Sequence, residues 1–241
     1  MMKMILIIPT YNEVENLPKL LQTVFALELP GLQVLIVDDG SPDGTGQVAE
    51  TLKEKYPRKL DVLHRSGKQG LGTAYIQGFQ WAISHGADFV GQMDADFSHA
   101  PEKVLALHNA ISECDLAIGS RYILGGSVDK NWAFWRKALS AFGNSYARII
   151  LHLPAKDVTG GFRLWRAEKL AQLPLEKVRS NGYVFQVEML YLAHKLGLKI
   201  KEIPIYFAER EFGASKMSLR IQLEAALRVW WLLWQYRDLT S

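Results

Sequence analysis

The sequence predicts an α/β fold in which a mostly parallel sheet is flanked by helices, and three observations lead to that prediction. Short apolar runs rich in Val, Ile and Leu recur along the first half of the chain. Segments with helical periodicity separate them, and polar turns follow several of the runs. Strands that alternate with helices in this way pair in parallel, because each helix returns the chain to the same edge of the sheet.

Five of these apolar runs are the predicted strands. They are residues 4–8 (MILII), 34–37 (VLIV), 61–64 (DVLH), 88–93 (DFVGQM) and 116–120 (LAIGS). Four segments are predicted helices, namely residues 13–27, 44–55, 71–85 and 101–112. The first three helices each lie between two strands, and the fourth precedes the last strand.

Short polar turns follow three of the predicted strands. PTYNE follows the first strand, DDGSPDGT the second and DADFSH the fourth. In open α/β sheets, ligands bind outside the carboxyl ends of the strands. We therefore expect these three turns to converge on one cleft, which is the predicted active site.

Two aromatic-rich segments follow the predicted sheet, at residues 131–153 and 218–237, and five of the seven tryptophans lie in them. In the second segment, charged residues four positions apart form one polar stripe: Arg220, Glu224 and Arg228. This helix carries too many charges to span a membrane. We expect it to lie in a bilayer interface or on a partner, and the alternative is that it caps the core of the domain.

Length and composition exclude several classes of protein. The chain of 241 residues, 49% of them hydrophobic, is long enough for one large domain with its own core. A net charge of +3 is too small to indicate a nucleic-acid-binding protein, and no nucleic-acid partner is expected. The single cysteine, Cys114, excludes an intrachain disulfide and a thiolate zinc cage, and it fits a cytoplasmic location.

No segment has the length expected of a membrane anchor or a signal peptide. A spanning helix needs roughly 18 consecutive apolar residues, and no run in the sequence reaches that length. The apolar run before Pro9 is shorter than the core of a signal peptide, so it is interpreted as the first strand.

Common nucleotide-binding and hydrolase motifs do not match. GKQGLGTAY (67–75) opens a predicted helix but lacks the third glycine of a dinucleotide fingerprint, and Lys68 precedes the loop instead of following it as in a P-loop. The sequence contains no HExxH or GxSxG, and its six histidines lack metal-ligand spacing. His99 is interpreted as a loop residue rather than a ligand.

Two carboxylates, Asp94 and Asp96, close the fourth predicted strand. In an extended backbone, alternate side chains point the same way, so we expect these two acids to lie side by side. Such a pair can hold a divalent cation, divide acid and base roles, or cap the following helix.

The turn after the second strand favours the first of these uses. It adds Asp38, Asp39 and Asp43 to the same rim, and so much negative charge favours a bound cation. A hard cation that takes only one or two protein carboxylates, with water and phosphate as its other ligands, is Mg²⁺ or Mn²⁺ on a diphosphate. The sequence therefore predicts a substrate with a pyrophosphate group.

Eight segments together resemble one enzyme family. In chain order they are PTYNE, VDDGSPDGT, GLGTAY, MDADFSH, GSRY, TGGFR, GYVFQVEML and EREFGASK, spread over residues 9–216. In these segments the chain is similar to the dolichol-phosphate (polyprenol-phosphate) mannose synthases, which are inverting glycosyltransferases of family 2 with a Rossmann-like GT-A fold. The last two segments resemble the mannose branch in particular.

The resemblance implies a donor site for GDP-mannose. The nucleotide would contact five residues: Pro9, Tyr11, Glu13, Val37 and Asp39. The metal, Mg²⁺ or Mn²⁺, and the diphosphate would lie against Asp94, Ala95 and Asp96, with the two carboxylates as metal ligands. Two cations of the segment 209–216 would reach the donor phosphates as a closing lid: Arg210 and Lys216. Some members have Gln where this chain has Ser98, so a ligand role for Ser98 is left open.

The resemblance also implies a polyprenyl monophosphate as acceptor. Arg121 and Arg136 would hold its phosphate, and Asp94, Asp96 and Arg121 would be the catalytic residues. Simple chemistry favours such an acceptor. A phosphate monoester, whose second pKa is about 6, is mostly a dianion at neutral pH and needs no general base. It needs positive charge, which the forked donors of arginine supply.

These implications predict a peripheral enzyme on the cytoplasmic face of a membrane. Its predicted organisation is a catalytic domain at residues 1–210, including an acceptor helix at about 131–153, followed by a lid and an amphipathic helix at 211–241. A small membrane-anchoring subunit is kept as a further partner. Three alternatives stay open: a UDP-sugar donor such as UDP-glucose, a nucleotidyltransferase that makes a sugar nucleotide, and a catalytically silent membrane-recruiting subunit.

Overall fold

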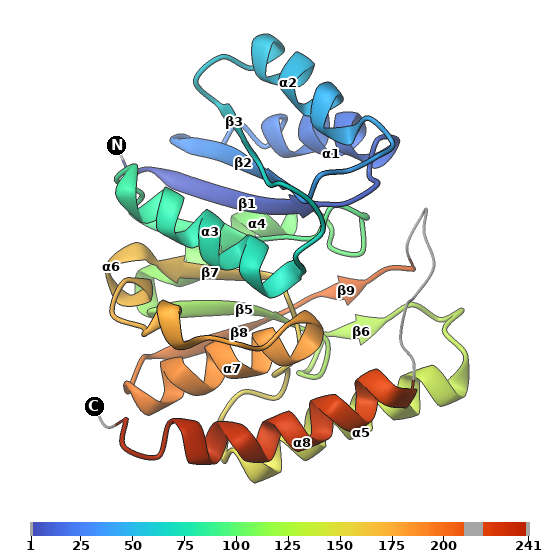
Figure 1. Cartoon of the computed structure of the whole chain (residues 1–241), viewed down its shortest axis with the longest axis vertical. Coiled ribbons are helices and arrows are strands. Elements are labelled where there is room, and N and C mark those ends of the chain that lie inside the picture. The colour runs from blue at the N-terminus through green and yellow to red at the C-terminus, as the bar shows by residue number, and fades with distance from the viewer. Residues whose placement is uncertain (1, 210–218, 240–241) are drawn as a thin grey trace.

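A computed structural model describes residues 2–209 and 219–239 and confirms the predicted α/β fold. Within these residues, seven strands form one sheet in the order β3-β2-β1-β4-β7-β5-β8 (Figure 1). They are β1 (Met4–Thr10), β2 (Leu32–Asp38), β3 (Leu60–His64), β4 (Phe89–Gln92), β5 (Leu116–Ser120), β7 (Arg163–Arg166) and β8 (Ile200–Pro204). A separate two-stranded sheet pairs β6 (Ser127–Val128) with β9 (Tyr206–Phe207).

Helices cover both faces of the large sheet. They are α1 (Asn16–Phe25), α2 (Thr45–Lys55), α3 (Leu71–Ser84), α4 (Lys103–Ala110), α5 (Phe134–Ile150), α6 (Ala167–Leu170), α7 (Gly182–Lys195) and α8 (Leu219–Gln235), with 3₁₀ turns at Ile111–Glu113 and Leu175–Lys177. Alternate residues of β1 face two different cores: Ile5 and Ile7 pack with α3 and α7, whereas Leu6 and Ile8 pack with α1 and α4. Burial on both faces explains why this strand is a continuous apolar run.

All five predicted strands and all four predicted helices are confirmed, but the large sheet contains two strands that the sequence analysis missed, β7 and β8. The edge strand β8 pairs in parallel with β5, and β7 lies antiparallel between β4 and β5. The first residue of β7, Arg163, is fully buried and donates hydrogen bonds to the carbonyl oxygens of Gly160, Gln186 and Val158 at 2.9, 2.8 and 3.1 Å. A charged residue in this position hides the apolar character by which a central strand is normally recognised.

The two aromatic-rich helices, α5 and α8, lie side by side (Figure 1). Tyr146 of α5 links them, because its hydroxyl donates to the Ala226 carbonyl oxygen at 3.2 Å and accepts from the Trp230 indole at 2.9 Å. Within the described residues, no helix combines the length and the apolar character that a membrane span requires.

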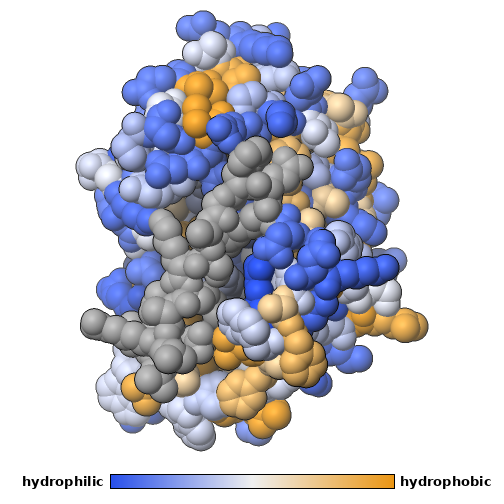
Figure 2. All heavy atoms as spheres, turned by 90° about the vertical axis from the view of Figure 1, so that its right-hand side faces the viewer, coloured by the Kyte–Doolittle hydropathy of each residue, from blue (hydrophilic) through white to orange (hydrophobic). Residues whose placement is uncertain are grey.

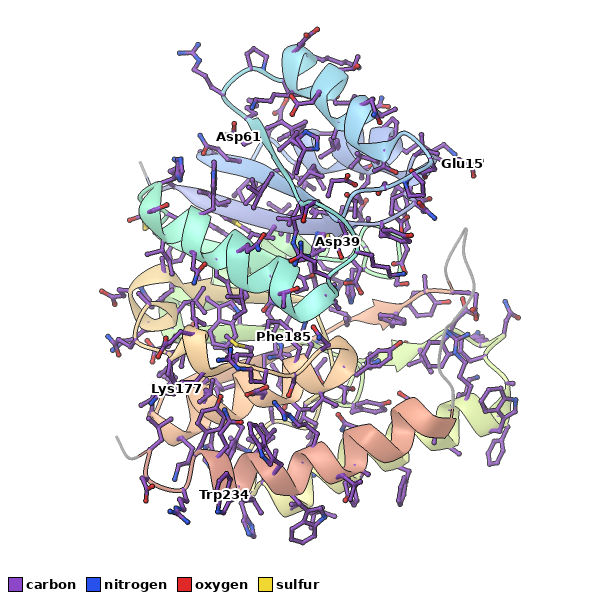
Figure 3. The ribbon with its side chains drawn as sticks, viewed as in Figure 1. Glu15, Asp39, Asp61, Lys177, Phe185 and Trp234 are labelled. Atoms are coloured by element: carbon purple, nitrogen blue, oxygen red, sulfur yellow. The ribbon has the colours of Figure 1, made fainter. Side chains whose placement is uncertain are left out.

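Helix α8 turns its apolar residues both inward and outward. Its buried side chains, Val229 and Leu232, pack into the core together with Tyr236, which directly follows the helix, so the predicted alternative of a capping helix is correct for this face. The opposite face exposes 73% of Leu227, 56% of Trp230 and 63% of Trp234, and Trp234 points away from the protein (Figure 3).

The predicted polar stripe of α8 does not face water at Arg228. This side chain turns inward, donates to the Ser180 hydroxyl at 3.2 Å, and lies 3.6 Å from the centre of the Trp231 ring. Polarity on this part of the helix is therefore inverted, because the Arg228 cation faces the protein while Leu227, Trp230 and Trp234 face outward.

A buried carboxylate joins α8 to α7. Glu188 is fully buried and accepts hydrogen bonds from the Tyr236 hydroxyl at 2.7 Å and from the Ser180 amide at 2.9 Å. Burial and the neighbouring Glu188 carboxylate hold the pKa of Tyr236 far above its ordinary value, so the phenol stays a donor.

We expect Tyr236→Phe to destabilise the fold by about 1–3 kcal/mol, because a buried carboxylate loses one of its donors. The free energy of unfolding from urea titration measures this loss. The matched control is Tyr206→Phe, which removes a 2.7 Å hydrogen bond to Asp129 at an exposed site and should cost less. Equal losses in the two variants would show that Glu188 does not need this donor.

Candidate active site

The three predicted turns do converge at the carboxyl edge of the sheet. Thr10 at the end of β1 pairs with Asp38 of β2, and Ile7 pairs with Gln92 of β4. The first two turns also bond directly, since the amide of Asn12 donates to the Ser41 hydroxyl at 3.1 Å. At this edge a cavity of about 620 Å³ is lined by Asp38, Gly40, Ser41, Gly46, Gln47, Glu50, His64 and Arg65.

Local hydrogen bonds satisfy two acids of the second turn, so the charge of these two acids does not by itself call for a cation. Asp38 accepts from the hydroxyls of Thr10 at 3.0 Å and Ser41 at 2.6 Å. Asp43 accepts from the amide and hydroxyl of Thr45, at 3.0 and 2.6 Å, where α2 begins. Partial burial acts to raise the pKa of Asp43, but the bonds from Thr45 and Val14 outweigh it and leave the pKa lowered.

Asp39, the third acid, forms a buried ion pair with Arg65, which the sequence analysis did not single out. The Asp39 carboxylate also accepts the amides of Gln69 and Gly70 at 3.3 and 3.1 Å, which ties the turn after β2 to the loop before α3 (Figure 3). Arg65 follows β3 as a single arginine that belongs to no sequence motif, so only its contact with Asp39 in the folded chain reveals that it pairs with this acid.

Two further residues of the predicted donor site lie against the same loops. The Lys68 ammonium lies 4.0 Å from the centre of the Tyr11 ring, which is a cation–π contact. Glu13 accepts from the side-chain amide of Asn16 at 2.8 Å, and its own backbone amide donates to the Thr45 hydroxyl at 2.9 Å. Pro9 and Val37 pair with each other across β1 and β2. The structure therefore brings the five predicted nucleotide-contacting residues to one edge of the sheet.

Asp94 and Asp96 lie in a bend after β4, so the predicted extended geometry is wrong for this pair. The following residue, Phe97, has φ of 58°, and the Ser98 amide donates to Asp96 at 3.0 Å. Both carboxylates nevertheless act on one buried group. Burial raises the pKa of the Tyr75 hydroxyl well above its ordinary value, and Asp94 and Asp96 raise it further.

His99 is packed into the same bend. Its ring stacks on Phe162 with 5.0 Å between centres and meets the Phe207 ring edge-on at 5.2 Å. Nδ1 accepts the Asp94 amide at 3.4 Å. Burial lowers the pKa of His99 although Asp94 and Asp96 act to raise it, so the ring is neutral at neutral pH. These contacts agree with its interpretation as a loop residue.

The groups around this bend fit a hard cation. Asp94 keeps 29% of its side chain exposed, whereas Asp96 and Ala95 are buried. The Ser98 hydroxyl is buried and has no hydrogen-bond partner among the described residues, which makes it a third oxygen beside the two carboxylates. The described part of the chain contains no cluster of three His, Cys, Asp or Glu side chains suited to a metal. An all-oxygen set completed by water and phosphate is typical of Mg²⁺ and Mn²⁺ sites.

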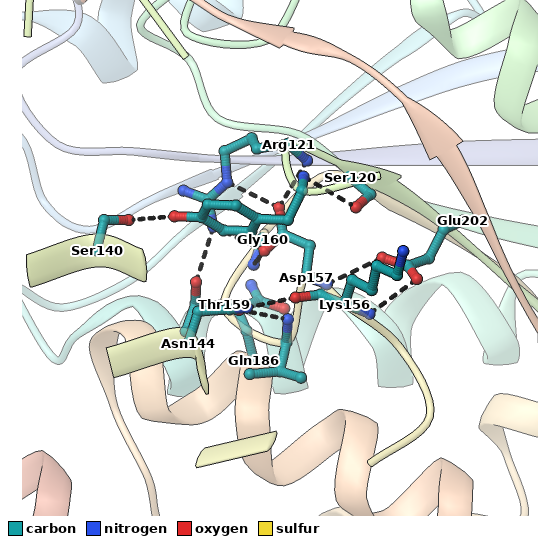
Figure 4. A network of polar contacts seen from close by, with 12 residues as sticks. Ser120, Arg121, Ser140, Asn144, Lys156, Asp157, Thr159, Gly160, Gln186 and Glu202 are labelled. Atoms are coloured by element: carbon teal, nitrogen blue, oxygen red, sulfur yellow. Dashed lines mark hydrogen bonds and ion pairs between the residues drawn. The ribbon is translucent and has the colours of Figure 1, made fainter. Parts of the chain in front are cut away.

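Arg121 follows β5 and is held by Asp157 (Figure 4). The backbone amide and Nε of Arg121 donate to one Asp157 oxygen at 2.9 and 2.8 Å, and Nη2 donates to the other at 2.7 Å. Nη2 also donates to the Thr159 hydroxyl at 2.7 Å. None of these bonds uses Nη1. This ion pair is not a surface salt bridge, because both side chains are buried.

The two charges of this pair stabilise each other. Burial acts to lower the pKa of Arg121, but Asp157 raises it above its ordinary value. Burial likewise acts to raise the pKa of Asp157, but the hydrogen bonds and charge of Arg121 lower it. Both groups therefore remain charged at neutral pH.

The loop that carries Asp157 is attached to its neighbours at both ends (Figure 4). Glu202 of β8 accepts the amides of Lys156 and Asp157 at 2.8 and 2.9 Å. Asn144 of α5 accepts the Val158 amide at 2.8 Å and donates to the Lys156 carbonyl oxygen. The sequence analysis missed Asp157, Asn144 and Glu202, because isolated polar residues on separate elements form no pattern along the chain.

Arg136, the second predicted acceptor residue, lies on α5 near Arg121. Its guanidinium carbon lies 3.8 Å from the centre of the Trp132 ring, and Nη1 pairs with Glu209 at 2.6 Å. Trp132 is buried and meets Phe207 edge-on at 5.7 Å, and the Arg121 guanidinium lies 5.3 Å from the centre of the same Phe207 ring. Phe207 thus lies between the two predicted acceptor residues. The other two predicted cations, Arg210 and Lys216, lie outside the described residues.

Comparison with known proteins identifies one family and curated proteins that are similar over most of the chain. The profile of the family described as "Glycosyl transferase family 2" matches residues 5–173. The polyprenol monophosphomannose synthase of Mycolicibacterium smegmatis is 45% identical over 226 residues, which are 93% of this chain and 84% of that protein. The undecaprenyl-phosphate mannosyltransferase of Micrococcus luteus is 46% identical over 228 residues, or 95% of this chain and 93% of that protein.

Solved structures with low sequence identity share the fold. A glucosyl-3-phosphoglycerate synthase from Mycobacterium tuberculosis, in complex with Mn²⁺, UDP-glucose and phosphoglyceric acid, has a TM-score of 0.67 at 16% identity, over 97% of this chain and 79% of that one. A mannosyltransferase from Pyrobaculum calidifontis, in complex with GDP-mannose and Mn²⁺, has a TM-score of 0.61 at 16% identity. That match covers 93% of this chain, which spans 61% of that protein.

We expect Asp157→Ala to lower the free energy of unfolding by about 3–5 kcal/mol, because it leaves the Arg121 charge buried without its partner. The pKa of Asp157 is lower in the folded chain than its unfolded value of about 3.9. The stabilising contribution is therefore complete above that value and is lost as pH falls through the folded pKa. Urea titrations at pH 7 and at successively lower pH values measure the difference between the variant and the wild type.

Two further variants make this prediction specific. Glu113→Gln breaks the exposed pair with Lys201 and should change stability little. The double variant Arg121→Met, Asp157→Leu should recover part of the loss, because no unpaired charge remains. A loss with Asp157→Ala no greater than that with Glu113→Gln would contradict the role of Asp157.

Proposed function

Because this chain belongs to glycosyl transferase family 2, we propose that it transfers mannose from GDP-mannose to the phosphate of a polyprenyl monophosphate, with inversion at the sugar carbon. One observation carries this proposal: two curated proteins whose names state mannosyl transfer to such lipids are 45% and 46% identical across nearly the whole chain. The chain is an enzyme of the glycosyltransferase class, and the choice of donor and acceptor is the proposed part.

The donor nucleotide binds, in this proposal, along the carboxyl edge of β1 and β2. Pro9, Tyr11, Glu13, Val37 and Asp39 are its proposed contacts. Their support is that all five lie on adjacent strand ends and turns. The hydrogen bonds and ion pair of Asp39 order the neighbouring loop, so the pocket is formed before the nucleotide enters.

The diphosphate of the donor binds beside the bend after β4. Asp94 and Asp96 would hold Mg²⁺ or Mn²⁺ there, with the Ser98 hydroxyl as a further oxygen. The bound cation supplies positive charge that offsets the charge developing on the leaving diphosphate. Arg210 and Lys216 remain predicted phosphate contacts from the segment 209–216.

The acceptor phosphate needs charge and position rather than a base. One of its oxygens forms the new bond to the sugar carbon, the bond to GDP breaks, and GDP leaves with that electron pair. No proton is removed from a dianionic phosphate. Nη1 of Arg121 makes none of the hydrogen bonds to Asp157 and Thr159, so it is the proposed contact, with Arg136 beside it. His99 is buried and its Nδ1 already accepts a backbone amide, so this nitrogen is not available as a base.

The lipid acceptor implies a membrane surface, and α5 and α8 are the proposed contact with it. Both helices expose large apolar side chains: Phe134, Trp135, Phe142, Ile149, Leu227, Trp230 and Trp234. Apolar side chains gather at the lower end of the face seen in Figure 2, where α5 and α8 lie in Figure 1. Aromatic residues with nearby arginines suit the headgroup region of a bilayer.

This placement defines the rest of the proposal. The enzyme is peripheral on the cytoplasmic face, with residues 1–210 as the catalytic domain and residues 211–241 as lid and amphipathic helix. Asn144 supports a connection between the proposed membrane surface and the proposed acceptor site, because it forms a hydrogen bond between α5 and the loop that positions Arg121. A small membrane-anchoring subunit is the alternative partner for the exposed apolar surface.

We expect the purified protein to transfer labelled mannose from GDP-mannose to a polyprenyl phosphate in the presence of Mn²⁺, and to stop when EDTA is added. Asp94→Asn and Asp96→Asn should each lower the rate by about a thousandfold or more, because charge stabilisation of the leaving diphosphate is lost. Asp61→Asn, on β3 and away from the bend, is the matched control and should stay active (Figure 3).

Each alternative has its own outcome in this assay. Transfer from UDP-glucose alone would replace the mannose assignment, and release of inorganic pyrophosphate would indicate a nucleotidyltransferase. Full activity of Asp94→Asn and Asp96→Asn would show that the bend after β4 takes no part in the reaction.

We expect the protein to co-sediment with vesicles of phosphatidylcholine and phosphatidylglycerol. The double variant Trp135→Glu, Trp234→Glu should bind at least about tenfold more weakly, because it places charge on the apolar surface. Leu105→Glu on α4, where the wild-type side chain is 37% exposed, is the control and should bind normally. Failure of the wild type to bind vesicles would favour the anchoring subunit instead.

A further inference from the structure

Gln186 on α7 carries a buried amide group that the reaction described so far does not use. Its side chain is 2% exposed, and Nε2 has no hydrogen-bond partner among the described residues. Buried amide donors are almost always paired, so an unpaired one beside an active site indicates a ligand.

Gly161 leaves open a small space between this amide and Asp94. A Cβ atom added at Gly161 would stand 3.3 Å from Nε2 of Gln186, and 3.7 and 3.9 Å from the two carboxylate oxygens of Asp94. Any other residue would fill the space. The glycine, the amide and the carboxylate therefore line one cradle next to the proposed diphosphate site.

The direction of the Gln186 amide is determined by its neighbours. The Trp165 indole can only donate, and it donates to Oε1 of Gln92 at 2.8 Å. Gln92 must then present its NH₂ group, which donates to Oε1 of Gln186 at 3.3 Å. Gln186 is left with its own NH₂ group for the cradle. Trp165 and Gln92 are fully buried, so this order of donors cannot be reversed by water.

The backbone around the cradle is also held in place. Arg163 donates to the carbonyl oxygens of both Gln186 and Gly160, at 2.8 and 2.9 Å. Burial lowers the pKa of Arg163 to about 9, so it stays charged at neutral pH. The buried guanidinium of Arg163 thus holds α7 and the segment Gly160–Gly161 in place relative to each other.

The chemistry of the cradle selects its ligand. A group placed there meets an amide donor on one side and a carboxylate acceptor on the other. A hydroxyl group satisfies both, since it accepts and donates at once, whereas a phosphate oxygen only accepts and would be repelled by Asp94. We propose that Gln186 is a donor-sugar specificity residue, whose amide donates to a hydroxyl of the transferred hexose while that hydroxyl donates to Asp94. This inference rests on the proposed function.

The test combines a variant with changes in the substrate. Gln186→Met keeps the length of the side chain but removes the donor. We expect it to lower kcat/KM for GDP-mannose by about tenfold to a hundredfold, as loss of a buried hydrogen bond to a substrate does. Among GDP-mannose analogues that each lack one hydroxyl, one should react equally with both enzymes, because its bonding partner is already absent. The other analogues should keep the full difference.

Binding measurements provide a second readout. Calorimetry in the presence of Mn²⁺ should give the same affinity of both enzymes for GDP but weaker binding of GDP-mannose by Gln186→Met. Gln172→Met at an exposed position is the matched control and should behave as wild type. Thermal unfolding of Gln186→Met checks that the variant is folded.

The outcomes separate the two proposals. The role of Gln186 would be overturned if the wild type and Gln186→Met differed in kcat/KM by the same factor for every deoxy analogue. An equal loss of affinity for GDP and for GDP-mannose in the variant would also overturn it. If the wild type fails to transfer mannose, the proposed function fails. In that case, binding measurements on the wild type and Gln186→Met still decide the role of Gln186. The quantity compared is the ratio of the affinity for a sugar nucleotide to the affinity for the free nucleotide, measured for GDP-mannose with GDP and for UDP-glucose with UDP. An unchanged ratio in both pairs overturns that role.

Discussion

The buried carboxylate of Asp157 organises the proposed acceptor half of the site. It accepts four hydrogen bonds, three from Arg121 and one from the Gly160 amide at 3.0 Å. A fully buried charge is stable only when it is paired and hydrogen-bonded, so this requirement fixes the arginine and the glycine loop together. Arg121 can then direct positive charge into the cleft without rearranging. Such preorganisation is what stabilisation of a charged transition state requires.

The antiparallel strand β7 connects this half of the site to the proposed donor half. It pairs with β4, which ends at the bend of Asp94, and with β5, which ends at Arg121. Because β7 lies between the parallel strands β4 and β5, the carboxyl ends of β4 and β5 both lie beside the loop of Gly160 and Gly161. Arg163, at the start of β7, supports this arrangement because its buried guanidinium donates to carbonyl oxygens of both the loop and α7.

The paired helices α5 and α8 show how a polar core contact and an apolar surface can belong to one element. Arg228 faces inward to Ser180, while Leu227 and Trp230 face outward. This inversion would be costly in water but suits a helix whose outer face meets lipid or a partner. The same surface includes α5, whose Asn144 reaches the loop of Asp157. The surface formed by α5 and α8 is therefore connected through Asn144 to the loop that positions Arg121.

The sequence by itself determined the five parallel strands β1 to β5 and the edge of the sheet where the candidate site lies. Apolar runs such as residues 4–8 identify strands because burial on both faces requires them, and the edge of the sheet that binds ligands follows from strand direction. Tertiary structure alone decided the partners of each charge. The pairing of Arg65 with Asp39, the burial of Arg163 and the orientation of Gln186 depend on contacts between residues far apart in the chain. Sequence spacing cannot encode such contacts, since they arise only when separate elements pack and exclude water.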